Sequence, residues 1–223
     1  MRISSLALSF MLFASPVRAG SEPPAGPVDR VTLGQSPEPV PELLPVPDSR
    51  QSTSYSCGAA ALRSVLGYYG IQVDEEELMA KLATSPQEGT RPEAILRVAR
   101  EYGLEAELRQ GVTLDELERE VQAGRPTIVD AQAWREGEEL KLPWTEVWES
   151  GHYMVAIGMD KENVYFEDPS LEWSMGKIPR QELMDRWHDY ENGPNGERQV
   201  YRQAAIFFRG KQPSPPPVII PID

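Results

Sequence analysis

The sequence predicts a single α+β domain in which helices pack on an antiparallel sheet, and three observations indicate this fold class. Four segments between residues 57 and 124 repeat apolar residues at helical spacing, with suitable capping residues at their ends. Later segments are β-branched or alternate apolar and polar residues, as strands do. The helices come mostly first and the strands mostly second, which favours an antiparallel sheet over alternating βαβ units.

The four expected helices are recognised by their ends. The first begins at or beside Cys57 and stops at Gly70, and its apolar residues recur every three or four positions. The other three are expected at residues 75–83, 91–103 and 114–124. Their end signals are Asp74 and Thr113 as N-caps, Pro92 near a helix start and Gly103 as a C-terminal stop.

Strands are expected at residues 104–110, 126–134 and 203–210. Residues 151–168 are expected to form two strands joined by a turn at Asp160 to Asn163. Antiparallel pairing through that turn brings the outer ends of the two strands close together. A long polar loop precedes this hairpin, and residues 180–190 are expected to form a short amphipathic helix.

Distinct segments flank the expected domain. Residues 1–19 have a positive start, a short apolar stretch and small residues before a cleavage site, as a secretory signal peptide does. The apolar stretch is shorter than the roughly 20 residues that span a bilayer, so no stable membrane insertion is expected after cleavage. Residues 20–48 are expected to be a proline-rich linker or arm, 49–210 the domain and 211–223 a proline-rich C-terminal tail. The protein is therefore expected to be exported, to a bacterial periplasm or to the extracellular space.

Charge and motif content argue against several classes of function. The formal net charge of −13 disfavours binding to nucleic acid or to anionic lipid. The sequence has no G-x-x-x-x-G-K-[ST] phosphate loop, no H-E-x-x-H helix and no paired C-x-x-C sequence. We therefore expect no cofactor, no metal and no nucleic-acid partner.

Cys57 is the only cysteine, so it cannot form a disulfide within the chain. It is either an inert buried thiol or a reactive one. At the start of a helix the dipole favours the thiolate, and the backbone N–H of Cys57 has no partner within the helix. Together with the side chain of Gln51, six residues upstream, that N–H could hold the oxyanion that forms when a thiolate attacks a carbonyl.

A thiol nucleophile needs a base, and the chain has two histidines. His188 lies in a charged helical stretch, where a surface role is expected. His152 starts an apolar strand directly after Gly151, at an edge where a sheet presents side chains to a cleft, and is the better candidate. Asp168 ends the partner strand of the expected hairpin and could fix the tautomer of His152.

This sequence resembles a known family at four positions that occur in the same order. The family is that of the papain-like bacteriocin-processing peptidases, which cut double-glycine leader peptides, together with their stand-alone relatives. The matches are Gln51, Cys57-Gly58, Gly151-His152-Tyr153 and Asp168-Pro169. The resemblance covers about residues 49–210 and implies a papain-like fold. It also implies that Cys57 is the nucleophile, His152 the base, Asp168 the orienting partner of the base and Gln51 the oxyanion donor.

Two features set this chain apart from those leader peptidases. Ser56 stands where they commonly have Asp, so Ser56 is a candidate substrate contact and specificity near the nucleophile is expected to differ. They are often the front end of an ATP-driven exporter, whereas this chain has no ATP motif. Residues 134–150 lead into His152 and contain Trp134, Trp144 and Trp148, so this loop is expected to overhang the cleft. Trp144 and Trp148 are further candidates for contact with substrate.

The expected function is hydrolysis of peptide bonds in a peptide or protein substrate. Two alternatives remain open. An amine could intercept the same acyl-thioester, which would make the protein a transpeptidase or transamidase, or the fold could serve as a non-catalytic peptide-binding module. Retention of all four matched positions counts against the binding module. The sequence leaves open the natural substrate, the cleavage-site preference and the oligomeric state.

Overall fold

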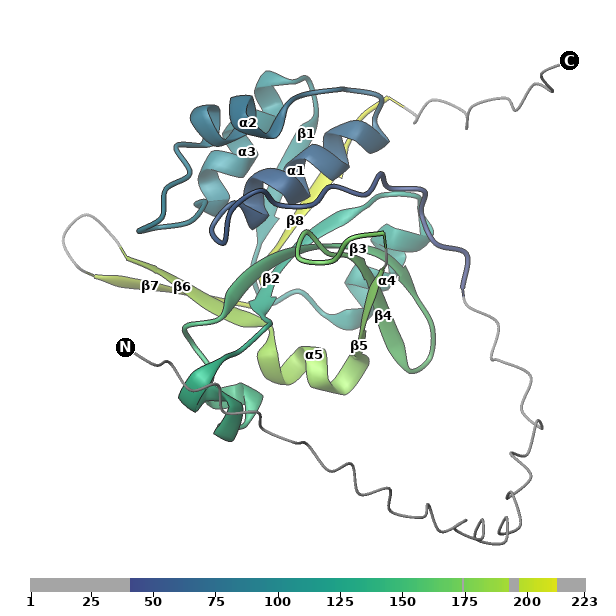
Figure 1. Cartoon of the computed structure of the whole chain (residues 1–223). Helices are drawn as coiled ribbons and strands as arrows, with labels where there is room; N and C mark the ends of the chain where they lie inside the picture. The colour runs from purple at the N-terminus through teal and green to yellow at the C-terminus, as the bar shows by residue number, and fades with distance from the viewer. Residues whose placement is uncertain (1–40, 174, 193–196, 212–223) are drawn as a thin grey trace, which may run out of the picture. The chain divides into compact units, whose positions relative to one another are not determined.

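A six-stranded antiparallel sheet with the strand order β1-β8-β2-β3-β4-β5 forms the centre of the fold (Figure 1). Its strands are β1 (Glu105–Arg109), β2 (Thr127–Gln132), β3 (Gly151–Met159), β4 (Asn163–Glu167), β5 (Gly176–Pro179) and β8 (Ala205–Arg209). The computed structural model describes residues 41–173, 175–192 and 197–211. The predicted signal peptide, most of the linker and nearly all of the C-terminal tail lie outside these ranges. Within them, no helix combines the length and the apolar character needed to cross a membrane.

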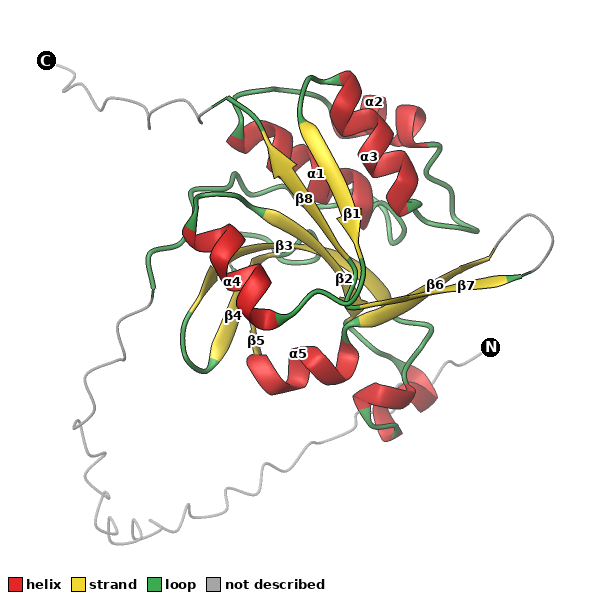
Figure 2. Ribbon diagram, turned by 180° about the vertical axis from the view of Figure 1, so that it is seen from behind, coloured by secondary structure: helices red, strands yellow, loops and turns green. Residues whose placement is uncertain are grey.

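Helices cover both faces of the sheet (Figure 2). One face carries α1 (Cys57–Tyr68), α2 (Glu75–Leu82) and α3 (Pro92–Glu101), and the other carries α4 (Leu114–Gln122) and α5 (Arg180–Arg186). Two short 3-10 helices, η1 (Gly137–Lys141) and η2 (Trp144–Glu146), lie in the loop before β3. The four helices expected before residue 124 and the hairpin expected over residues 151–168 are therefore present.

Strand β3 shows how the sheet separates two cores. Tyr153, Val155 and Ile157 belong to the core beneath α1, whereas Met154 and Ala156 belong to the core beneath α4 and α5. Successive side chains of a strand point to opposite faces, so an unbroken apolar run fits a strand that is covered on both sides. This double cover makes β3 a rigid support for the residues at its start.

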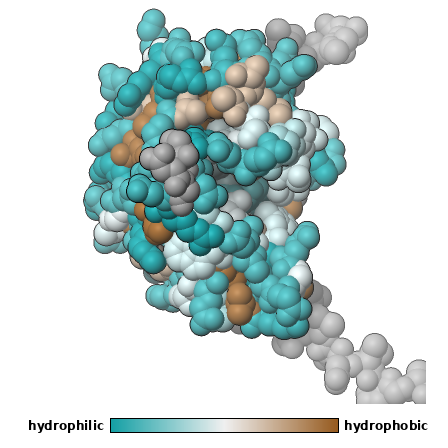
Figure 3. All heavy atoms as spheres, turned by 90° about the vertical axis from the view of Figure 1, so that its left-hand side faces the viewer, coloured by the Kyte–Doolittle hydropathy of each residue, from teal (hydrophilic) through white to brown (hydrophobic). Residues whose placement is uncertain are grey.

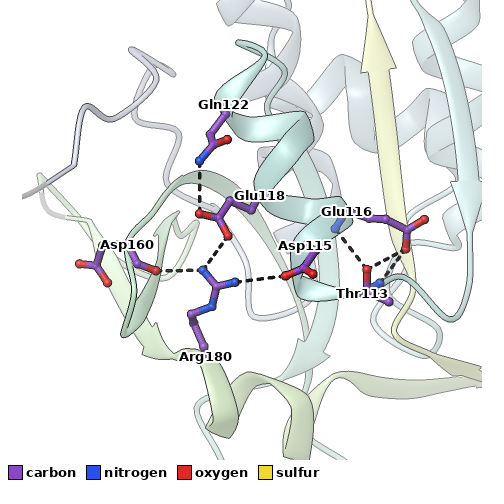
Figure 4. Close-up of polar contacts among 7 residues, drawn as sticks. All are labelled: Thr113, Asp115, Glu116, Glu118, Gln122, Asp160 and Arg180. Carbon is purple, nitrogen blue, oxygen red and sulfur yellow. Dashed lines mark hydrogen bonds and ion pairs between the residues drawn. The ribbon is translucent and has the colours of Figure 1, made fainter.

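Arg180, the first residue of α5, ties that helix to its neighbours (Figure 4). Its guanidinium donates to Glu118 Oε2 at 2.9 Å and to the backbone carbonyl of Asp160 at 2.9 Å. At the start of α4, Thr113 and Glu116 form a capping box. The N-cap expected at Thr113 is therefore confirmed, and α4 begins where the sequence placed it.

A β-bulge between Ala156 and Gly158 shifts the register of β3 against β4. Val155 pairs with Glu167 before the bulge, and Gly158 pairs with Tyr165 beyond it. A shift of one residue moves every following side chain to the opposite face of the sheet. Val155 pairs with Glu167, so the next pair beyond it is Met154 and Asp168. The side chains of these two residues line the same cavity.

The end of the predicted linker packs against the domain, so the ordered fold begins before Ser49. The Leu44 N–H donates to the Ile157 carbonyl at 2.8 Å, and Val46 is buried. Leu43 covers Gly158, where an added Cβ would overlap its side chain. Residues 43–46 therefore cover β3 at the bulge and are not the loosely packed chain that the proline content suggested.

The helix expected over residues 180–190 is too long, because α5 ends at Arg186 and a strand follows. Strands β6 (His188–Asn192) and β7 (Arg198–Arg202) pair with each other in a separate two-stranded ribbon. Between helix and strand, Trp187 is fully buried and donates its indole N–H to the Ala204 carbonyl at 2.8 Å. Pairing with β7 and this anchor are contacts with distant residues, and they override the local helical pattern.

Candidate active site

Cys57 is the first residue of α1, at the helix end that carries the positive partial charge. Its side chain is half-buried. The backbone N–H groups of Tyr153 and Gly58 lie near the sulfur and help to lower the pKa of the thiol. Only glycine fits at position 58, because a Cβ there would lie 2.6 Å from Thr90 Cβ. The local sequence Cys-Gly therefore lets the thiol sit in a close-packed niche lined with donors.

His152 is the second residue of β3 and lies opposite Ala131 of β2. Only 6% of the residue is exposed. Its Nε2 lies 2.6 Å from Asp168 Oδ1. Its ring also lies against the Cys57 side chain, close enough for the two groups to shift each other's pKa. Because Nε2 is engaged by Asp168, Nδ1 is the nitrogen that remains for Cys57. The imidazole therefore bridges the thiol and the carboxylate.

Asp168 directly follows β4, and each of its oxygens has a donor. Oδ1 also accepts the Ser170 backbone N–H at 2.9 Å, and Oδ2 accepts the indole N–H of Trp134 at 3.1 Å. Burial alone would raise the pKa of Asp168, but the bonds from His152, Ser170 and Trp134 outweigh it and lower the pKa. The carboxylate is thus held charged and fixed in orientation.

The thiol and the imidazole shift each other toward a charged pair. Burial raises the pKa of Cys57, but His152, together with the backbone N–H groups of Tyr153 and Gly58, more than offsets it, and the net pKa is lowered. Burial lowers the pKa of His152, yet the bonds to Asp168 and Cys57 raise it to about 10. A lowered thiol pKa beside a raised imidazole pKa favours thiolate and imidazolium at neutral pH.

Gln51 lies beside this group, anchored to the segment that follows Asp168. Its backbone N–H donates to the Pro169 carbonyl at 2.9 Å, and its Oε1 accepts the Ser170 hydroxyl at 3.3 Å. Its Nε2 donates one hydrogen to the Thr53 carbonyl at 2.7 Å. An amide nitrogen carries two hydrogens, so a second one is left for an oxyanion.

Two adjacent cavities meet at the thiol and the imidazole. The first, of about 240 Å³, is lined by Cys57 and is called the Cys57 cavity below. The second, of about 410 Å³, is lined by Gln51 and His152 and is called the His152 cavity. Both are lined by Ser54, Glu149 and Gly151, so they form two halves of one cleft. An extended peptide could cross the catalytic group from one cavity to the other.

The structure separates the two candidate tryptophans. Trp148 lines the Cys57 cavity and packs on His188, with ring centroids 4.3 Å apart. Trp144 lies between the guanidinium groups of Arg135 and Arg186, at 4.1 and 4.4 Å, and lines a different cavity. Only Trp148 is therefore positioned to contact a substrate at the thiol, and that contact stays a prediction.

Two sequence-based placements change. Ser56 is fully buried, and its hydroxyl accepts the Thr53 N–H at 3.1 Å, so its side chain shapes the turn before α1 instead of meeting a substrate. His188 is buried rather than on the surface, because its Nε2 bonds the Val147 carbonyl at 2.8 Å and its ring stacks on Trp148. The rejection of His188 as the base agrees with this structural role.

Trp134 contacts Asp168, and the sequence did not predict this contact. Its backbone has φ +56°, a left-handed conformation that non-glycine residues rarely adopt, and its indole donates to Asp168. The sequence pattern that could have predicted this contact is the position of Trp134, two residues beyond β2. Strand β2 pairs with β3. A tryptophan at that edge of the sheet lies near the start of β3, where His152 is.

We expect Trp134→Phe to lower kcat about 3- to 10-fold with a smaller change in KM, because one hydrogen bond to a charged group is lost while the ring remains. Trp144→Phe is the matched control, since Trp144 makes no hydrogen bond to Asp168 among the described contacts, and it should change kcat less than about 2-fold. Steady-state kinetics on one peptide would check both variants. An unchanged kcat in Trp134→Phe would contradict the positioning role.

Comparisons with curated proteins give partial matches. The chain is 29% identical over 138 residues to the transport/processing ATP-binding protein ComA of Streptococcus pneumoniae, covering 61% of this chain but only 17% of that protein. It is 32% identical over 121 residues to an uncharacterized protein of Methanothermobacter thermautotrophicus, covering 54% of this chain and 70% of that one. The chain thus spans less than a fifth of the length of ComA.

Solved structures share the fold. A putative C39-like peptidase from Bacillus anthracis aligns with a TM-score of 0.58 at 21% identity, over 78% of this chain and all of that one. A double glycine motif protease from an AMS/PCAT transporter, in complex with its leader peptide, aligns with a TM-score of 0.51 at 22% identity, over 77% of this chain and 94% of that one. The predicted papain-like α+β fold is confirmed by these matches.

A family-wide comparison covers most of the domain described above. The model of the Peptidase_C39 like family matches residues 43–194, which is more than half of the chain and includes Cys57, His152 and Asp168. The matched range begins at Leu43, whose side chain packs on Gly158 in the structure. This chain belongs to the C39-like peptidase family.

Proposed function

We propose that this chain is a thiol peptidase that hydrolyses peptide bonds through Cys57, His152 and Asp168, with Gln51 as an oxyanion donor. The observation that carries the proposal is the buried imidazole of His152, which bridges the Cys57 thiol and, at 2.6 Å, the Asp168 carboxylate. Family membership supports peptidase chemistry on peptide substrates. The exported location expected from residues 1–19 is part of this proposal.

In the first half of the reaction, the Cys57 thiolate attacks the carbonyl carbon of the scissile bond. The negative charge moves to the carbonyl oxygen, where the backbone N–H of Cys57 and the second hydrogen of Gln51 Nε2 donate to it. His152, as imidazolium, gives its proton to the leaving amine while the C–N bond breaks. An acyl-thioester on Cys57 and a free amine result.

In the second half, neutral His152 removes a proton from water as the water attacks the thioester. The C–S bond breaks, the acid product leaves, and thiolate and imidazolium are restored. Asp168 holds the ring in one orientation and favours its charged form throughout, and Trp134 holds Asp168. If an amine instead of water took the acyl group, mass spectrometry of the products would show a new amide bond.

The proposal predicts a specific pH dependence for alkylation of Cys57 by iodoacetamide. Only the thiolate reacts, so the rate should rise with pH through an inflection below the ordinary thiol pKa of 9.0, because His152 lowers the pKa of Cys57. In His152→Ala the inflection should move upward, since burial then acts without the compensating charge. Mass spectrometry of the labelled protein gives the rate at each pH.

His188→Gln is the matched control for this measurement, because it removes the other imidazole of the chain. His188 bonds the Val147 carbonyl and not the thiol, so the inflection should stay where the native protein has it. A native inflection at or above 9.0, or an equal upward shift in both variants, would contradict an activated Cys57 thiolate.

A further inference from the structure

The Cys57 cavity has an acidic wall. Four carboxylate residues line it, and among the residues that the structure describes no Lys or Arg does. The four are Glu88, Glu149, Asp189 and Glu191. The last two belong to β6, which projects toward the face seen in Figure 3, where the exposed side chains are mostly hydrophilic. The cavity therefore combines the Cys57 thiol with a cluster of carboxyl groups.

Two of these carboxylates are already paired and two are not. Glu88 forms an ion pair with Arg91 at 3.0 Å, and Glu149 forms one with Arg198 at 3.4 Å. Within the described ranges, neither Asp189 nor Glu191 has a Lys or Arg nitrogen within ion-pair distance. The carboxyl groups without an ion-pair partner thus lie on the β6 side of the cavity.

Asp189 is held directly beside the catalytic group. It packs on Gly151, the residue before His152, so closely that a Cβ at Gly151 would overlap its carboxylate. Its Oδ1 accepts the Gln132 side-chain N–H at 3.1 Å. The carboxyl group of the buried Asp130 is close enough that the charge of Asp189 adds to burial in raising the pKa of Asp130. Gly151 is thus required for close approach, and Asp189 has little freedom to turn away from the cavity.

Unsatisfied polar atoms at the same place indicate a missing ligand group. Tyr153 lines the cavity with only 5% of the residue exposed, and its hydroxyl has no hydrogen-bond partner in the described part of the chain. The same holds for Oδ1 of Asp130, which is opposite Tyr153 in the sheet. A buried polar atom without a partner is destabilising, because it gives up its hydrogen bonds to water and gains none. Such atoms are therefore usually paired, here with something the chain does not supply.

The chemistry of the missing group follows from these acceptors. Carboxylates accept hydrogen bonds, and a tyrosine hydroxyl accepts as well as donates. An ammonium offers three donors and a guanidinium five, whereas an apolar or anionic group would leave the acceptors unpaired. Burial, and then the charge of Asp189, raises the pKa of Glu191 to about 8, and the charge of Arg91 offsets this only in part. A cation bound in the cavity would favour the charged form of this carboxyl group.

We infer that the Cys57 cavity binds a Lys or Arg side chain of the substrate, from one of the two residues that precede the scissile bond. The inference rests on the proposed peptidase function. His152 must protonate the leaving amine, and it lines the His152 cavity, so the leaving group lies there. The acyl part of the substrate therefore lies in the Cys57 cavity, where Asp189, Glu191 and Tyr153 meet its cationic side chain.

The test uses two peptide libraries, which differ in the single position that is fixed while all other positions are randomised. In one library the fixed position is the first residue before the cleaved bond, and in the other it is the second. Each library is made in two versions, with Arg or with citrulline at the fixed position, because citrulline has the same shape as Arg without the charge. We expect kcat/KM for Arg to exceed that for citrulline by about 10-fold or more at one of these positions. Liquid chromatography with mass spectrometry identifies the cleaved bond and its rate.

Asp189→Asn should reduce the Arg-to-citrulline ratio of kcat/KM to below about 3. Glu191→Gln should also lower this ratio, and it provides an independent test if Asp189→Asn folds poorly. Glu105→Gln is the matched control: Glu105 is exposed on β1, outside the cavity, and the ratio should not change. A native ratio near 1, or a high ratio that survives both cavity variants, would overturn the inference while leaving the peptidase function intact.

A binding measurement separates the two proposals. Titration calorimetry of Cys57→Ala with the same fixed-position peptides should show tighter binding of Arg than of citrulline, and the preference should be lost when Asp189→Asn is added. If no peptide is hydrolysed but this preference is found, the hydrolase proposal fails and the cation site stands. If neither hydrolysis nor preferential binding is found, the cation site is refuted.

Discussion

Peptide hydrolysis by His152→Ala is expected to fall about 1,000-fold or more in kcat relative to the native protein. The variant loses the proton donor for the leaving amine, the base for the attacking water and the charge that stabilises the Cys57 thiolate. All three losses affect the same reaction. The other histidine, His188, cannot compensate for them, because it bonds the Val147 carbonyl and not the thiol. Initial rates of hydrolysis of a peptide library give the ratio of the two kcat values, and a melting curve shows that the variant is folded.

The same prediction has a second arm that tests whether the two residues act together. Cys57→Ala should reduce activity at least as far as His152→Ala, and the double variant should be no slower than Cys57→Ala alone, because removal of either member disables the pair. Purely additive losses would contradict a shared mechanism. His152→Ala with more than about a tenth of native kcat and a normal melting curve would refute the base assignment.

Trp187→Ala is expected to lower the free energy of unfolding by about 3–5 kcal/mol. The indole is fully buried in the core beneath α4 and α5, and its N–H bonds the Ala204 carbonyl at 2.8 Å. Removal leaves a cavity and an unpaired carbonyl at the junction of α5, β6 and β8. Urea unfolding followed by circular dichroism measures the change, since the midpoint should fall without a large change in slope.

Trp173→Ala is the control for that measurement, because Trp173 is 84% exposed. It should change the free energy of unfolding by less than about 0.5 kcal/mol, as surface substitutions usually do. A loss below about 1 kcal/mol in Trp187→Ala, or equal losses in the two variants, would show that the core closes around the missing indole. In that case Trp187 would not be the anchor that ends α5.

The proximity of Cys57, His152 and Asp168 could be predicted from the sequence because these residues lie at the ends of regular elements. Cys57 begins a helix, and His152 begins a strand whose partner ends just before Asp168. The hairpin rule brings those strand ends together without further information. Trp134 was not assigned because its bond to Asp168 depends on a left-handed backbone turn, which no local pattern signals.

The errors share one physical cause. Residues 43–46 pack on β3 and residues 188–192 pair with β7, so both segments owe their structure to partners distant in the sequence. Ser56 was chosen for its place before the nucleophile, but its hydroxyl is taken by Thr53 within a tight turn. Local propensity says little where a tertiary partner supplies the hydrogen bond or the buried surface.

The sequence by itself determined the α+β class, the first four helices, the β3–β4 hairpin and the order of Gln51, Cys57, His152 and Asp168. Periodicity, capping and turn signals are local, so a single chain is enough to show them. The tertiary structure decided on which side of the sheet Asp168 lies. The bulge at Ala156 to Gly158 shifts β4 by one residue, and a strand reverses its faces with every residue. That register depends on a glycine covered by Leu43 from the N-terminal arm, a contact between distant parts of the chain.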